Sequence, residues 1–76
     1  FFDYCITESG GAKRLGTVMT TWDSSNATWT DTSTPDLNNS TLGIGFTVTV
    51  SGGNVNFNSV VTSGTWTVRL AVRVIY

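Results

Sequence analysis

The sequence predicts an all-β fold, a small antiparallel β-sandwich of about six strands with meander or jelly-roll-like connections. Valine and threonine, which favour extended strands over helices, provide 9 and 14 of the 76 residues. Apolar and polar residues alternate with a period of two in several segments, as in half-buried strands. Turn-forming residues separate these segments at short intervals, which leaves no room for crossover helices and therefore favours antiparallel pairing.

The first half of the chain predicts three strands, and Gly16 interrupts the second of them. A glycine inside a strand indicates a bulge or a close approach of another group to the backbone. Adjacent glycines make residues 8–11 a turn, and the run of Asp, Ser and Asn at 23–26 is typical of a hairpin turn. The expected strands are residues 1–7, 13–22 and 27–32.

The second half predicts three further strands after an irregular stretch at residues 33–42. This stretch contains the only proline, Pro35, which cannot donate a hydrogen bond to a sheet. The glycine pair Gly52-Gly53 and the dipeptide Ser63-Gly64 predict tight hairpin turns between consecutive strands. The expected strands are residues 43–50, 55–62 and 65–76, and the last is unusually long.

The length predicts a single domain covering residues 1–76. We expect it to be a piece of a longer protein, because the chain lacks an initiator Met and begins directly in a strand. A domain of this size buries only ~60% of the surface that its unfolded chain exposes. Small domains usually gain stability from disulfides, a metal or a partner. The only cysteine, Cys5, could pair only with another copy, so burial against another copy, or against more of a longer parent chain, is the remaining route.

The composition argues against an enzyme and against several kinds of partner. The chain has no histidine, so it cannot form a histidine-based triad, and its single cysteine excludes a Cys-rich metal site. Four of the five acidic residues lie at expected turns or strand ends, where they commonly organise the backbone. We therefore expect no catalytic residues, cofactor or metal. A net charge of −1 and the absence of a long apolar run predict neither nucleic-acid binding nor membrane insertion.

Trp22, Asp23 and Trp29 flank one expected hairpin and are the candidate binding residues. An exposed aromatic face beside an acidic side chain can stack on a sugar and form hydrogen bonds with it, so these residues could bind a glycan or another receptor. Two alternatives remain open. The tryptophans could instead be core or interface anchors, because Trp buries a large area, and Asp23 could serve only the turn.

The candidate interface residues are Phe1, Phe2, Arg69 and Arg73. The strand at the N-terminus and the long last strand offer edges to which another strand could add. The two arginines share one face of the last strand. They could be solvated residues that protect an edge, or they could bind carboxylates such as Asp3 or Asp31 of a neighbouring copy.

Several segments, read in order, carry a resemblance to a known class of protein: FDYCIT, KRLGTVMTTWD, TDTSTPDL, FTVTVSGGNV and SGTWTVRLAVRVIY. Together they cover nearly the whole chain, which resembles a β-structured module at the C-terminal end of tail-fibre and other virion proteins of tailed bacteriophages. The resemblance implies an extracellular virion part, built as a homotrimer, that recognises the host or ends a shaft. It supplies no catalytic residues.

Two other functions fit the same residues. The chain could be a self-assembling coat, decoration or filament subunit, because its outer strands offer edges for strand addition. It could also be a carbohydrate-binding module that uses its tryptophans. In every case the expected partners are other copies of the chain or a host surface glycan or protein.

Overall fold

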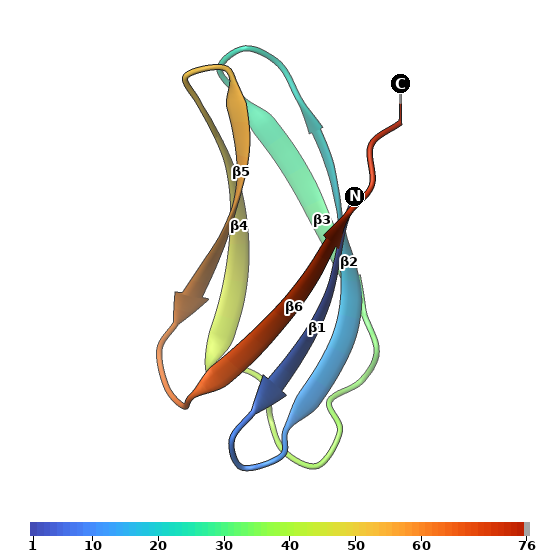
Figure 1. The fold of residues 1–76 in the computed structure, drawn as a ribbon, viewed down its shortest axis with the longest axis vertical. Coiled ribbons are helices and arrows are strands. Elements are labelled where there is room, and N and C mark those ends of the chain that lie inside the picture. The colour runs from blue at the N-terminus through green and yellow to red at the C-terminus, as the bar shows by residue number, and fades with distance from the viewer. Residues whose placement is uncertain (76) are drawn as a thin grey trace.

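The computed structural model describes residues 1–75, which form six strands and no helix (Figure 1). The strands are β1 (Phe2–Glu8), β2 (Lys13–Trp22), β3 (Ala27–Ser33), β4 (Ile44–Ser51), β5 (Asn54–Val61) and β6 (Trp66–Val72). Every strand pair is antiparallel, and the strands form two layers in a body of 39 × 22 × 16 Å. The predicted all-β sandwich is thus confirmed.

The larger sheet has the order β3-β2-β1-β6, and the smaller sheet is the hairpin β4-β5. The first three strands form the expected meander. After passing through the β4-β5 hairpin, the chain returns so that β6 lies beside β1, which is the strand order of a Greek key. The two sheets are therefore unequal, with four strands facing two.

The connection between β5 and β6 differs from the expectation. Ser63-Gly64 is not a hairpin turn, because β5 and β6 belong to different sheets. The backbone N–H of Thr62 donates to the carbonyl of Gly43 at 2.8 Å, and that of Ser9 donates to the carbonyl of Thr65 at 2.9 Å. These bonds hold the chain first at the start of β4 and then at the end of β1, so the segment crosses between the layers.

The expected hairpin turn between β4 and β5 is confirmed. Gly52 and Gly53 both have positive φ angles, 58° and 79°. Two central residues with positive φ make the turn whose twist matches that of the flanking strands, and glycine adopts this conformation without steric cost.

Strand β6 is shorter than predicted and ends at Val72. The backbone N–H of Arg73 donates to the carbonyl of Phe1 at 2.9 Å, and the terminal amine of Phe1 donates to the carbonyl of Arg73 at 2.8 Å. The ladder between β1 and β6 ends with this pair of bonds. The last residue of the predicted strand, Tyr76, lies outside the described residues.

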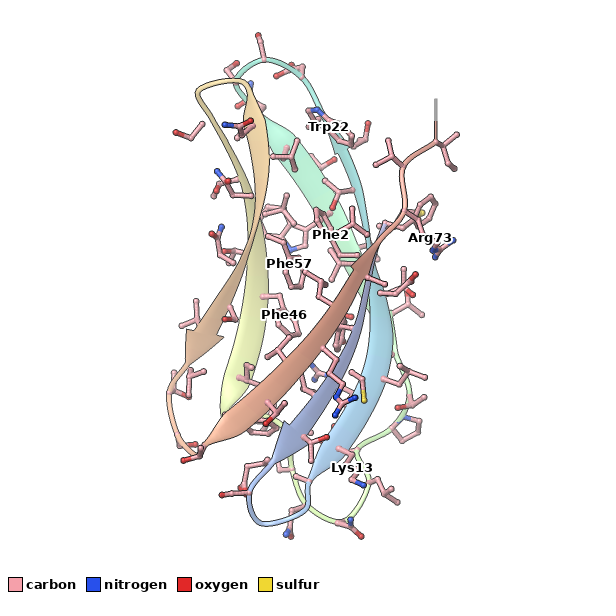
Figure 2. The ribbon with its side chains drawn as sticks, viewed as in Figure 1. Phe2, Lys13, Trp22, Phe46, Phe57 and Arg73 are labelled. Carbon is pink, nitrogen blue, oxygen red and sulfur yellow. The ribbon has the colours of Figure 1, made fainter. Side chains whose placement is uncertain are left out.

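The core lies between the hairpin and the middle of the larger sheet. A row of stacked or tilted aromatic rings joins the two layers, with centroid distances of 4.8 Å for Phe2–Phe57, 4.8 Å for Phe57–Phe46 and 4.6 Å for Phe46–Tyr4 (Figure 2). Such pairs contribute ~0.5–1.5 kcal/mol each beyond the area that they bury. The buried apolar residues are Tyr4, Ile6, Ala12, Val18, Ile44 and Val48.

Gly16 makes the close approach that its position in a strand suggested. It lies opposite Tyr4 in the β1–β2 ladder, and a Cβ at Gly16 would lie 2.5 Å from the Tyr4 hydroxyl. The same hydroxyl donates to the Asp31 carboxylate at 2.7 Å, and Arg14 lies 3.9 Å from Asp31 and over the Tyr4 ring. Burial and the Asp31 carboxylate raise the pKa of Tyr4 to about 12.

Candidate functional site

A cavity of about 700 Å³ at one end of the sandwich gathers four of the seven residues selected from the sequence. We call it the end cavity. It lies among the ends of β1, β2 and β5 and the segment after β6, and its wall is mostly apolar. It is lined by Phe1, Phe2, Thr20, Thr21, Trp22, Val55, Val72, Arg73, Val74 and Ile75.

The two tryptophans do not share this cavity. Trp22 is 50% exposed and lines it, whereas Trp29, which is 41% exposed, lines a separate hollow beside Met19 and Thr28. Val18 of β2 is buried in the core, and Thr20 and Trp22 lie on the same side of this strand because side chains alternate. Trp29 lies opposite Thr20, so both tryptophan rings are on the core-facing side of the larger sheet. Only Trp22 is therefore placed to contact a molecule in the end cavity.

Asp23 serves the β2–β3 turn. Its Oδ1 accepts hydrogen bonds from the backbone N–H groups of Ser25 at 2.9 Å and Asn26 at 2.8 Å. These two bonds lower the pKa of Asp23. The structure thus places Asp23 in the turn role that was one of the two alternatives, and it is not part of the cavity wall.

Arg73 binds Asp3 of its own chain. The guanidinium and carboxylate form two bonds, Nε–Oδ2 at 2.5 Å and Nη2–Oδ1 at 2.9 Å, and the guanidinium also lies 4.7 Å above the Phe1 ring. The hydroxyl of Thr17 donates to Asp3 at 2.7 Å. Asp3, one of the carboxylates that could have bound an arginine of a neighbouring copy, thus has an arginine partner within its own chain, because its position across from the end of β6 brings it to Arg73.

Asp31, the other such carboxylate, also has partners within the chain, Tyr4 and Arg14. Arg69 lies opposite Cys5 on the outer side of β6, is exposed and has no ion pair among residues 1–75. Its role at an interface stays a prediction. Cys5 is a free, half-buried thiol.

Phe2, which was expected at an interface, packs within its own chain, and its role at an interface stays a prediction. Its ring stacks on Phe57 and packs against the core of its own chain, because its side chain is on the same side of β1 as Tyr4. Phe1 remains at the surface, held by Arg73, on the rim of the end cavity.

The ion pair of Asp3 gives the stability of the fold a pH dependence. Hydrogen bonds from Arg73 and Thr17 lower the pKa of Asp3 from 3.8 to about 2. Because the folded-state pKa is the lower one, this contribution is complete above pH 3.8 and is lost as the pH falls toward 2. We expect Asp3→Asn to lower the melting temperature at neutral pH and to weaken its decline between pH 4 and pH 2.

Thermal melts followed by circular dichroism across this pH range test the prediction. Asp23 and Asp36 also have lowered pKa values, from backbone bonds at the turn and from the bond with Thr41, so part of the acid-induced decline should remain in the variant. An Asp3→Asn protein with the full wild-type slope would show that the pair contributes nothing.

A strip of apolar side chains on β6, formed by Val68, Leu70 and Val72, is the second notable surface. We call it the β6 strip. These residues lie opposite Ile6, Tyr4 and Phe2 in the ladder, so their side chains are on the core-facing side. They are nevertheless 37%, 47% and 58% exposed.

The unequal sheets explain this exposure. Phe57 of β5 stacks over Phe2 of β1, and β4 contacts β3, so the two-stranded hairpin lies over the β3-β2-β1 part of the larger sheet, in which β6 is the outer strand on the other side. Figure 1 shows the hairpin and the larger sheet as separate layers. The alternation in the sequence shows that one face of this segment is apolar. It cannot show that the face is uncovered, because that depends on the strand order.

Among residues 1–75, no three His, Cys, Asp or Glu side chains lie close enough to hold a metal ion. The same residues include no helix that is long and apolar enough to cross a membrane. No protein family, curated protein or solved structure matches this chain.

Proposed function

We propose that the chain is a non-enzymatic structural module of a phage tail fibre, in an extracellular virion, that assembles with other copies of itself and presents a surface to a host receptor or glycan. The observation that carries the proposal is the exposed β6 strip. Three neighbouring apolar side chains on the core-facing side of a sheet are typical of a surface that is covered in an assembly.

Other features support the same proposal. The resemblance to virion proteins is spread over nearly the whole sequence, and it is the source of the tail-fibre assignment. The small core gives the domain little stability of its own, so contact with a neighbouring chain would supply burial that the chain lacks. The side chains of Asp3, Asp23 and Asp31 form hydrogen bonds or ion pairs within their own chain, which favours a structural role for them over a catalytic one.

The mass of the protein in solution tests the assembly. Light scattering over a concentration series should give a folded species heavier than the 8.2 kDa chain, a trimer if the implied symmetry applies. A folded monomer at every concentration would contradict the proposal. Filaments in electron micrographs would instead favour a coat or filament subunit.

Glycan binding is the second candidate, and the half-exposed Trp22 ring in the end cavity favours it. We expect Trp22→Ala to abolish binding to a host surface polysaccharide, because the ring is the broad apolar face on which a sugar can stack. Trp29→Ala is the matched control and should leave binding unchanged, since Trp29 lies outside the cavity. A glycan array with both variants makes the comparison, and equal losses would contradict this assignment of the site.

A further inference from the structure

We infer that the outer edge of β6 pairs with the same edge of a second copy of this chain, antiparallel and with Leu70 opposite Leu70. The inference rests on the proposed self-association and identifies its surface and register. Among residues 1–75, β6 pairs only with β1, so its other edge is available. The partner is a second copy because the edge is complementary to itself in backbone bonds, side chains and charge.

The backbone bonds define which groups this edge offers. Phe1 and Arg73 exchange two hydrogen bonds, so the N–H and C=O of Arg73 point toward β1. These groups alternate in direction along an antiparallel strand. The bond from Ser9 to Thr65 fits the same alternation. The N–H and C=O groups of the alternate residues, among them Val68, Leu70 and Val72, therefore point away from β1 to the outer edge.

The core-facing side of this edge carries none of the features that usually block pairing. Proteins protect edge strands with prolines, bulges or inward-pointing charges. The opposite edge strand of this sheet, β3, has Asp31 on its core-facing side and is followed by Pro35. On β6 the core-facing side chains are all apolar, and Arg69 lies on the other side.

Hydrogen bonding and charge select the register. The outward-pointing groups belong to Trp66, Val68, Leu70 and Val72, so only registers that pair these residues with one another join the groups of both copies. A twofold axis at Val68 is such a register, but it places Val72 opposite Gly64, before β6 begins, and so leaves the most exposed residue of the β6 strip unpaired. A twofold axis at Arg69 places that residue opposite itself, and an axis at Ala71 places Arg69 opposite Arg73. Like charges directly opposite each other destabilise a pair of strands.

A twofold axis at Leu70 avoids both conflicts. It places Arg69 opposite Ala71 and Val68 opposite Val72, so apolar side chains meet apolar ones and no charges of the same sign are opposed. The two four-stranded sheets then join into one sheet with both hairpins on the same face. The interface is isologous, as in most dimers, and the two β6 strips contact each other along the join.

Disulfide trapping tests this register. In a Cys5→Ser background, Leu70→Cys should form a covalent dimer under mild oxidation, because residues in a hydrogen-bonded pair have Cα atoms ~5.5 Å apart, within the ~4.4–6.8 Å range of disulfides. Val68→Cys alone should not form one, since the two cysteines would be four positions apart along the strand, ~14 Å. Mixing Val68→Cys with Val72→Cys protein should restore the cross-link.

The outcomes separate this inference from the proposed function. If the protein assembles but Leu70→Cys does not cross-link, or if Val68→Cys alone cross-links as well as Leu70→Cys, the β6 register is wrong and self-assembly stands. A wild-type mass of three chains likewise overturns the twofold pair alone. A wild-type protein that stays monomeric overturns both. Circular dichroism of each cysteine variant establishes that it is folded, and the half-exposed Leu70 position makes this the expected result.

Discussion

Replacing Phe57 with alanine should destabilise the domain by ~3 kcal/mol, toward the lower end of the range for removing a buried phenylalanine side chain. The ring lies between Phe2 and Phe46, at 4.8 Å from each, and joins the hairpin to the larger sheet (Figure 2). A chain of this length has a total unfolding free energy of ~4–11 kcal/mol. Phe57→Ala therefore removes a large part of the stability.

Urea denaturation followed by fluorescence measures this change. Leu42→Ala is the control, because Leu42 is 87% exposed and its truncation should change the unfolding free energy by less than ~0.5 kcal/mol. Phe57→Leu should fall between the two, since it keeps much of the volume. A Phe57→Ala protein as stable as the control would mean that the aromatic row does not hold the layers together.

Replacing Gly16 with alanine should cost ~2–4 kcal/mol, although the same substitution usually stabilises a strand. Alanine restricts the unfolded chain, which alone would stabilise by ~0.4–1 kcal/mol. At Gly16, however, the new Cβ would lie 2.5 Å from the hydroxyl and 2.6 Å from Cζ of the buried Tyr4 ring. The ring must move, which costs ~1–3 kcal/mol of overpacking. The movement also strains the bond from Tyr4 to the charged Asp31 carboxylate, and a bond of this kind contributes ~1.5–3 kcal/mol.

Gly45→Ala is the matched control in another strand. A Cβ at Gly45 would have no atom within 4 Å, so alanine there should be neutral or slightly stabilising. Thermal melts should place Gly16→Ala ~10 °C or more below the wild type, given ~4–8 °C per kcal/mol for a domain of this size. If the two alanine variants melted together, Tyr4 would not be packed on Gly16.

Local patterns predicted most of the strands, because alternation and turn residues act within a few positions of the chain. The limits of β2 matched the expected residues 13–22, and the glycine pair at 52–53 specified its hairpin. The failures were non-local. Ser63-Gly64 has the composition of a hairpin turn, yet the chain crosses there between sheets. Alternation continues past Val72, so the pattern did not predict that β6 ends there.

The candidate site could be predicted only in part, for the same reason. Trp22, Phe1 and Arg73 were selected from separate segments, and only the strand order brings them to one cavity. The intrachain pair of Asp3 and Arg73 joins residues 70 positions apart, so no local signal could assign it. The exposure of the β6 strip follows from the unequal size of the sheets, which alternation does not encode.

The most direct test of assembly through β6 is the solution mass of Leu70→Lys measured beside the wild type. A lysine at this position would oppose the lysine of the second copy across the twofold axis, and like charges directly opposite destabilise the pair. We predict that the wild type assembles, that Leu70→Lys is a folded monomer, and that Thr30→Lys on the far strand β3 assembles as the wild type does. A Leu70→Lys protein with the wild-type mass would contradict this account.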